Sequence, residues 1–226
     1  MRTPSKKRLE PRRKPRQARS QATVEVILAA AARVLARAGY AATTTNHVAA
    51  KAGVSIGSLY EYFPSKDAIL VTLVERHLDE AERELGRALA ELGEARTSLD
   101  ETIARLVRVM VELHAGDPDL HRVLFEEAPM PVHLRSRVAR LEAWMANEVA
   151  RLLEGHGIEA GAARTAGAMA VQVVESLTHR LVVYGGGASG KGRYEGADPH
   201  VAEISLLLLA YLDRKRFSPE LATPVI

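Results

Sequence analysis

The stretch KAGVSIGSLYEYFPSK, residues 51–66, brings hydroxyl groups, aromatic rings and two glycines together. Serine and tyrosine hydroxyls are good hydrogen-bond donors to phosphate oxygens, so these side chains suit contact with a phosphate chain. Gly57 costs about 1 kcal/mol relative to alanine inside a helix, which makes sense where the backbone must come close to something bulky. Four of the ten Phe, Trp and Tyr residues of the chain lie between Tyr40 and Phe63. Aromatic side chains are therefore concentrated in the same region.

Two short helices joined by a glycine turn are predicted to position these residues. The first begins near Thr44 or Thr45 and ends at Gly53, which can adopt the left-handed conformation that a tight turn needs. Ser55 begins the second helix, and Pro64 closes it. A helix, a glycine-containing turn and a second helix form the helix-turn-helix pattern.

The second of these helices is too short to be stable alone and must be held by packing. Leu59 and Phe63 lie four residues apart and are expected to face the core. We expect the opposite face to offer Ser55, Ile56, Gly57, Ser58 and Tyr62, with Tyr60 on one flank.

Positive charge is concentrated at the N-terminus. Residues 1–20 hold nine Lys or Arg and one Glu, a charge of +8, whereas the whole chain carries only +3. A basic arm on a mildly acidic body is typical of nucleic-acid-binding proteins. The alternative is a solvated tail that only aids solubility.

Apolar residues at helical spacing continue through most of the chain, and no segment alternates as a strand. We predict an all-α fold of about nine helices. Three short helices lie near residues 20–63, and five or six long ones follow. Ser20 caps the first helix, which Gly39 ends, and Ser65 caps the first long one.

Residues 43–70, TTTNHVAAKAGVSIGSLYEYFPSKDAIL, resemble the DNA-binding signature of TetR-family transcriptional regulators. The resemblance covers residues 20–72, and beyond them only length and helix count agree. It implies an N-terminal three-helix domain with a helix-turn-helix and a larger C-terminal helical bundle. The expected division is a disordered basic arm at 1–19, a DNA-binding domain at 20–66, and a ligand-binding and dimerisation domain at 67–226.

The resemblance also assigns roles to individual residues. Ile56 stands where many relatives carry a polar or basic residue, so the bases that are read stay open. Arg16 and Arg19 of the arm are expected to follow the DNA backbone or enter the minor groove. The residues expected nearest the bases or adjoining backbone are Thr44, Thr45, Ser55, Gly57 and Ser58, and those expected to bind phosphate are Tyr60, Tyr62 and Lys66.

Polar side chains interrupt the apolar stripes of the C-terminal helices and indicate a ligand pocket. Instead of lining a pocket, the Met and Trp side chains could pack in the core, and the polar groups could form hydrogen bonds across a dimer. The candidate pocket residues are His114, Phe125, Trp144, Met145, Met169, Gln172, Glu175 and His179.

Catalytic and metal sites are not expected. The chain has no cysteine and no HExxH or Gly-x-Ser-x-Gly motif. The segment GGGASGKG, residues 185–192, nearly matches a phosphate-binding loop, but Gly192 replaces the required Ser or Thr. Six of the eight histidines are expected at the surface: His47, His77, His121, His133, His156 and His200.

The resemblance to TetR-family regulators, together with these observations, implies a homodimeric transcriptional regulator in the cytoplasm, a repressor without a cofactor. Its partners would be double-stranded DNA with a palindromic operator and an unidentified small-molecule effector, without a membrane. Dimerisation would use residues 160–184 and 198–213. Two alternatives are a nonspecific, architectural DNA-binding protein and a helical enzyme or carrier that kept the N-terminal fold.

Overall fold

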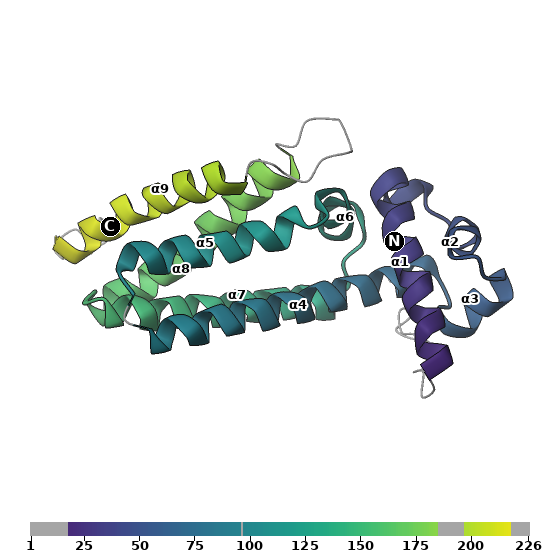
Figure 1. Cartoon of the computed structure of the whole chain (residues 1–226), viewed down its shortest axis with the longest axis horizontal. Helices are drawn as coiled ribbons and strands as arrows, with labels where there is room; N and C mark the ends of the chain where they lie inside the picture. The colour runs from purple at the N-terminus through teal and green to yellow at the C-terminus, as the bar shows by residue number, and fades with distance from the viewer. Residues whose placement is uncertain (1–17, 96, 185–196, 218–226) are drawn as a thin grey trace. The chain divides into compact units, whose positions relative to one another are not determined.

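The computed structural model describes residues 18–95, 97–184 and 197–217, which form nine α-helices and no strand (Figure 1). This confirms the all-α fold class. No helix within these ranges has an apolar stretch long enough to cross a membrane. The helices are α1 (Ala18–Ala42), α2 (Thr45–Ala52), α3 (Ile56–Tyr62), α4 (Lys66–Glu94), α5 (Leu99–Ala115), α6 (Pro118–Arg122), α7 (Val132–Gly155), α8 (Ala160–Thr178) and α9 (Ala197–Phe217), with π-helical segments at Val123–Glu127 and His179–Val183.

The chain divides into two compact units. The first contains residues up to Asp79 together with Asp119–Ser136, and the second contains Glu80–Pro118 and the residues from Arg137 onward. Helices α4 and α7 each contribute residues to both units. The functional division into segments 1–19, 20–66 and 67–226 stays a prediction. Arg16, the side chain of Arg19 and the glycine-rich loop at 185–192 lie outside the described residues.

In the first unit, α2 and α3 form the predicted helix-turn-helix. Thr44 caps α2 by accepting a hydrogen bond from the amide of His47 (3.2 Å). Gly53 then turns the chain with a φ of 68°. Ser55 caps α3 by accepting a hydrogen bond from the amide of Ser58 (3.0 Å). Each cap contributes about 1 kcal/mol, so residues adjacent in the sequence set where both helices begin.

The core of the first unit holds α3 in place. Leu59 and Phe63 are buried, as predicted, and Val54 packs against the same cluster. The prediction that Tyr62 lies on the exposed face is wrong, because its side chain belongs to the core and is only 8% exposed. Residues 59, 62 and 63 are three and four positions apart, so they share one face of the helix.

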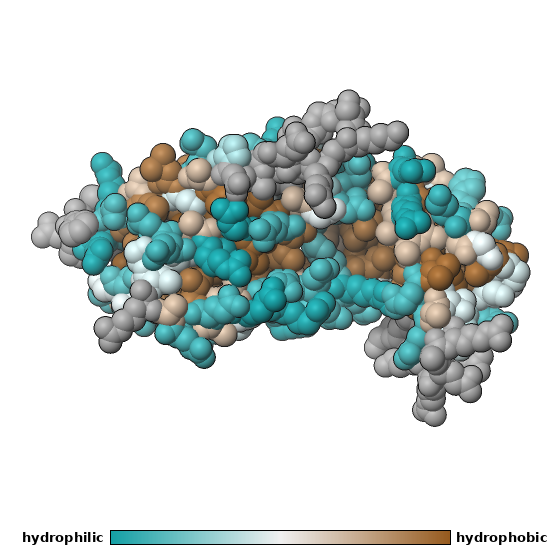
Figure 2. Space-filling view, viewed as in Figure 1, coloured by the Kyte–Doolittle hydropathy of each residue, from teal (hydrophilic) through white to brown (hydrophobic). Residues whose placement is uncertain are grey.

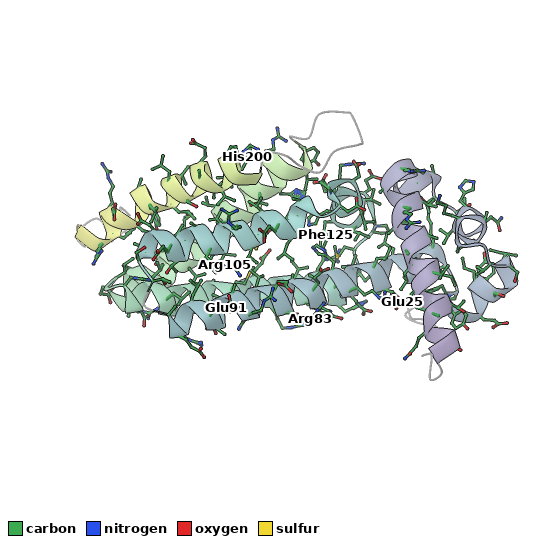
Figure 3. All side chains as sticks on the ribbon, viewed as in Figure 1. Glu25, Arg83, Glu91, Arg105, Phe125 and His200 are labelled. Carbon is green, nitrogen blue, oxygen red and sulfur yellow. The ribbon has the colours of Figure 1, made fainter. Side chains whose placement is uncertain are left out.

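In the second unit, α5 packs against α8 and α9, and α8 also packs against α9. An ion pair between Arg105 and Glu91 (3.4 Å) joins α5 to α4 (Figure 3). Gly167 lets α8 approach α7 closely. A Cβ atom at this position would lie 2.6 Å from the carbonyl oxygen of Ala146, a distance that real Cβ atoms do not show. The contact is with backbone, which cannot move aside as a flexible side chain would.

We therefore predict that Gly167→Ala forces α8 away from α7 and destabilises the fold by about 1–3 kcal/mol. Thermal unfolding checks this, with an expected fall in Tm of at least about 2 °C. Gly93→Ala is the matched control, because a Cβ there meets nothing within 4 Å. The control should be neutral or slightly stabilising. Equal Tm values for the two variants would contradict the close packing of α8 on α7.

Candidate DNA-binding surface and ligand site

One surface of the first unit collects most of the residues predicted to contact DNA. Tyr60 is 41% exposed and Ile56 is 38% exposed, although both are large side chains with apolar surface. Thr45 and Ser58 are partly buried beside them. The remaining predicted residues on this surface are exposed and are Thr44, Ser55 and Gly57. Hydroxyl groups, a tyrosine ring and open backbone therefore lie together on α2 and α3.

Hydrogen bonds orient the hydroxyl groups of this surface. The hydroxyls of Thr45 and Tyr60 lie 3.0 Å apart and link α2 to α3. Ser55 donates its hydroxyl proton to the hydroxyl oxygen of Ser58 (2.9 Å). Since a hydroxyl is both donor and acceptor, Ser58 keeps its own O–H group to donate elsewhere. The surface thus presents oriented donors, which is the chemistry that phosphate oxygens require.

Lys66 has a structural role that its sequence position does not indicate. Its ammonium group donates hydrogen bonds to the carbonyl oxygens of Tyr40 (2.7 Å) and Thr43 (3.0 Å). The same ammonium lies 4.0 Å from the centre of the Tyr40 ring. An ammonium group has three donors, so one is left for another partner. The predicted phosphate contact of Lys66 would use that last donor.

Tyr40 completes this link between the end of α1 and the start of α4. Its hydroxyl donates a hydrogen bond to Asp67 (2.7 Å). Burial raises the pKa of the Tyr40 hydroxyl, and the hydrogen bond to Asp67 raises it further, so the group stays protonated as a donor. Sequence reasoning missed this cluster, because residues 40 and 66 are far apart in the chain. The available signal was that an aromatic ring and a cation attract each other, as Tyr40 and Lys66 do here.

Two further polar residues of α2 lie exposed near the predicted contacts. Lys51 stands in the last turn of α2, and Asn46 stands in its first turn. Sequence reasoning did not assign either residue a role. The available signal for Lys51 was its position as a cation within the helix-turn-helix.

The second unit contains a cavity of about 40 Å³ with an entirely apolar lining. Five helices contribute to it: α4, α5, α7, α8 and α9. Met145, predicted to line a pocket, is part of this lining, and Met110 lines it as well. An apolar cavity of this kind stays dry and favours hydrocarbon over water.

Four polar side chains, which we call the polar rim, lie close in sequence to residues that line this cavity. His114 follows Met110 by one helical turn, and its Nε2 atom is 3.5 Å from a carboxylate oxygen of Glu175. Glu142 precedes Met145 by three residues and shares a side-chain hydrogen bond with Gln172. The predicted pocket residues of the rim are His114, Gln172 and Glu175. His179 lies beside it, with its ring 6.2 Å from that of His114.

Burial and charge shift the pKa of His114 in opposite directions and the pKa of Glu142 in the same direction. Burial lowers the pKa of His114, but the hydrogen bond and negative charge of Glu175 outweigh it and hold the pKa above its ordinary value. Burial also raises the pKa of Glu142, and the nearby charge of Glu175 adds to this effect. The rim therefore contains two carboxylates that repel each other, Glu142 and Glu175. The imidazole of His114 offsets part of their negative charge.

The structure does not bring the other predicted pocket residues to this site. Met169 is 48% exposed, because it lies on the opposite side of α8 from Val171 and Val174. Trp144 lines a separate open groove of about 370 Å³ with Glu82 and Arg137. Phe125 belongs to the first unit.

Phe125, which is labelled in Figure 3, instead forms an aromatic cluster with two histidines. The ring of His121 stacks on Phe125 at 4.5 Å, and His77 contacts both rings edge-on. The prediction of a surface position for His121 is wrong, since only 6% of it is exposed. Within the described ranges, no three His, Cys, Asp or Glu side chains are grouped so that they could hold a metal ion.

We predict that the pKa of His114 depends on Glu175. In the wild type the raised pKa means that His114 stabilises the fold fully below its unfolded pKa of about 6.5. This contribution is lost as the pH rises through the folded pKa. In Glu175→Gln, burial acts without the opposing charge, so the pKa should fall below its ordinary value.

An NMR titration of the His114 ring in both proteins checks this, together with the free energy of unfolding between about pH 5 and about pH 9. The stability advantage of the wild type should be largest at the acid end of the range. The same His114 pKa in both proteins would contradict the assigned role of Glu175.

Two family models match the chain, one in its N-terminal part and one in its C-terminal part. Residues 27–73 match the family model described as bacterial regulatory proteins, tetR family. Residues 98–212 match the model described as tetracyclin repressor-like, C-terminal domain. No curated protein matches the chain.

Solved structures of similar fold agree with these matches. A TetR-like transcriptional regulator from Rhodococcus sp. RHA1 is 24% identical, with a TM-score of 0.62 over 89% of this chain and 99% of that one. The fatty acid degradation regulator FadR from Bacillus halodurans is 22% identical, with a TM-score of 0.61 over 87% and 97%. FadR from Bacillus subtilis, solved in complex with stearoyl-CoA, is 22% identical, with a TM-score of 0.59 over 82% and 97%. The helix-turn-helix and the two family matches together identify the chain as a member of the TetR family of bacterial transcriptional regulators.

Proposed function

We propose that this TetR-family regulator is a homodimeric repressor that binds a palindromic operator and leaves it when a small-molecule effector binds. The observation that carries the proposal is the α2–α3 surface, where oriented hydroxyls and an exposed tyrosine stand on a buried core. In this account the chain binds DNA and effector in the cytoplasm and catalyses no reaction.

The DNA contacts divide by chemistry. Thr44, Thr45, Ser55, Gly57 and Ser58 would lie nearest the bases, and Ile56 is suited to apolar contact with a thymine methyl group. Phosphate contacts would position the protein rather than select the sequence. On the helix-turn-helix, these phosphate contacts would come from Tyr60, Lys51 and the hydroxyl of Tyr62. The remaining donor of Lys66 would add one more. Further phosphate contacts would come from Arg16 and Arg19 of the arm.

The apolar surface of α9 supports dimerisation. One side of α9 is buried within the second unit by Val201, Ile204 and Leu208. Yet Leu206 is 64% exposed and Leu207 is 51% exposed, and Figure 2 shows brown, hydrophobic residues at the surface over α9. A helix that is hydrophobic around most of its circumference is normally buried. A second copy of this helix would cover the exposed leucines in a two-fold interface.

The effector would bind the second unit and thereby release the DNA. The cavity is small, so a ligand that fills it must separate the helices around it. Such a ligand favours the conformation with the larger cavity, and it weakens DNA binding only by its differential affinity for the two conformations.

Selection of bound sequences from random duplex DNA tests the proposal. At physiological salt the wild type should enrich a palindrome whose half-sites are about one helical turn or more apart. Tyr60→Ala should bind the selected duplex about tenfold more weakly, because it loses an exposed phosphate donor. Val132→Ala, which shortens an exposed side chain outside α2, α3, α8 and α9, should bind it normally. If no sequence is enriched and binding follows the basic arm alone, the protein is an architectural DNA-binding protein instead.

The double variant Leu206→Glu/Leu207→Glu tests the dimer. Both side chains are exposed, so the fold should persist, but buried charges would disfavour the interface. Sedimentation should give the mass of a dimer for the wild type and of a monomer for the variant. Val132→Glu is the control, because this exposed apolar residue lies outside α8 and α9, and it should remain dimeric. A wild-type monomer, or a variant that stays dimeric, would contradict the proposal.

A further inference from the structure

The cavity of the second unit selects for hydrocarbon. Every lining side chain is aliphatic or a thioether, including Leu89, Val107, Met110, Met145 and Val174. Methionine is unbranched and flexible, so Met110 and Met145 can move to admit a longer ligand. At about 40 Å³ the space holds little more than a methyl group before such movement.

The polar rim selects for charge at the neighbouring position. Its ionisable groups are two carboxylates, Glu142 and Glu175, and the imidazole of His114; it contains neither lysine nor arginine. Glu175 interacts with both other groups, at 3.5 Å from His114 and by charge repulsion with Glu142. A positive charge bound here would relieve that repulsion, and a negative charge would increase it.

Thr178 of α8 adds a buried hydroxyl to this part of the second unit. The hydroxyl of Thr178 is completely buried and has no hydrogen-bond partner within the described part of the chain. Thr178 follows Val171 and Val174 by seven and four residues, so it lies on the stripe of α8 that lines the cavity. A buried hydroxyl without a partner carries a free-energy cost that a hydrogen-bonding ligand removes.

We propose that the effector is an amphiphile with a hydrocarbon body and a positively charged nitrogen. The body enters the apolar cavity, and the nitrogen lies at Glu142 and Glu175. This inference rests on the proposed function, because it names the ligand of the same regulatory site. The expected ligand differs in charge from the stearoyl-CoA with which the Bacillus subtilis FadR was solved. Coenzyme A carries several phosphates, which two carboxylates would repel.

Isothermal titration of the full-length protein with three ligands of equal chain length tests the inference. The probes are decylammonium, decanol and decanoate, each below its micelle concentration. Decylammonium should bind one per chain and at least about tenfold more tightly than decanoate, since each exposed charge pair contributes modestly. Decanoate binding equally or more tightly, or no binding of decylammonium, would overturn the inference.

Matched variants show whether the rim is responsible. In Glu142→Gln/Glu175→Gln the preference for decylammonium over decanoate should fall to near one, while decanol affinity stays constant. In the control Glu112→Gln/Glu154→Gln, which removes the same number of carboxylates from exposed positions of α5 and α7, the preference should persist. Circular dichroism verifies that both variants fold. A preference that persists in the rim variant would also overturn the inference.

DNA binding without any amphiphile separates this inference from the proposed function. If the protein selects a palindrome but decylammonium neither binds nor releases it, only the inference fails. If the protein selects no sequence, the proposed function fails whatever the amphiphiles do. Release of the selected duplex by decylammonium, but not by decanoate, is the expected result.

Discussion

The seven residues of α3 cannot form a stable helix in water on their own, and the first unit is organised around this constraint. Burial of Leu59 and Phe63 contributes about 1.5–3 kcal/mol for each side chain, and the Ser55 cap adds about 1 kcal/mol. These contributions allow a glycine to remain at residue 57, where it weakens the helix. An exposed glycine and exposed hydroxyls can therefore stand on a helix whose other side is fixed.

A polar link between α1 and α4, made by Tyr40, Lys66 and Asp67, also stabilises the first unit. Lys66 binds two main-chain carbonyl groups, and Tyr40 packs against its ammonium group and bonds to Asp67. Within the first unit this link fixes the two helices that flank the helix-turn-helix in sequence. The second unit differs in character, since its polar rim and apolar cavity leave a place where a ligand can change the packing of helices.

The parts of the fold that local chemistry sets could be predicted from the sequence. Capping by Thr44 and Ser55 and the left-handed turn at Gly53 depend on neighbouring residues only, and the structure confirms them. The buried position of Tyr62 and the bonds of Lys66 depend on residues distant in the chain. Spacing from Leu59 was the available signal for the buried position of Tyr62, whereas no spacing indicates the bonds of Lys66.

The candidate pocket shows the same limit. Its polar members were predicted because they interrupt apolar stripes. The structure pairs His114 with Glu175, and it joins Gln172 by a hydrogen bond to Glu142. Met169 lies on the side of α8 away from the cavity-lining Val171 and Val174, because the sequence does not show which side of this helix faces the cavity. Phe125 could not be assigned correctly, because the sequence does not show that its segment packs in the first unit.

We propose that the α2–α3 surface, held by the buried face of α3, reads a specific DNA sequence. The most direct measurement is the ratio of affinities for the selected palindrome and for a scrambled duplex of the same composition, at several salt concentrations. We expect a ratio of about 10³ or more that persists as salt weakens both affinities. Equal affinities that fall with the same dependence on salt would contradict it.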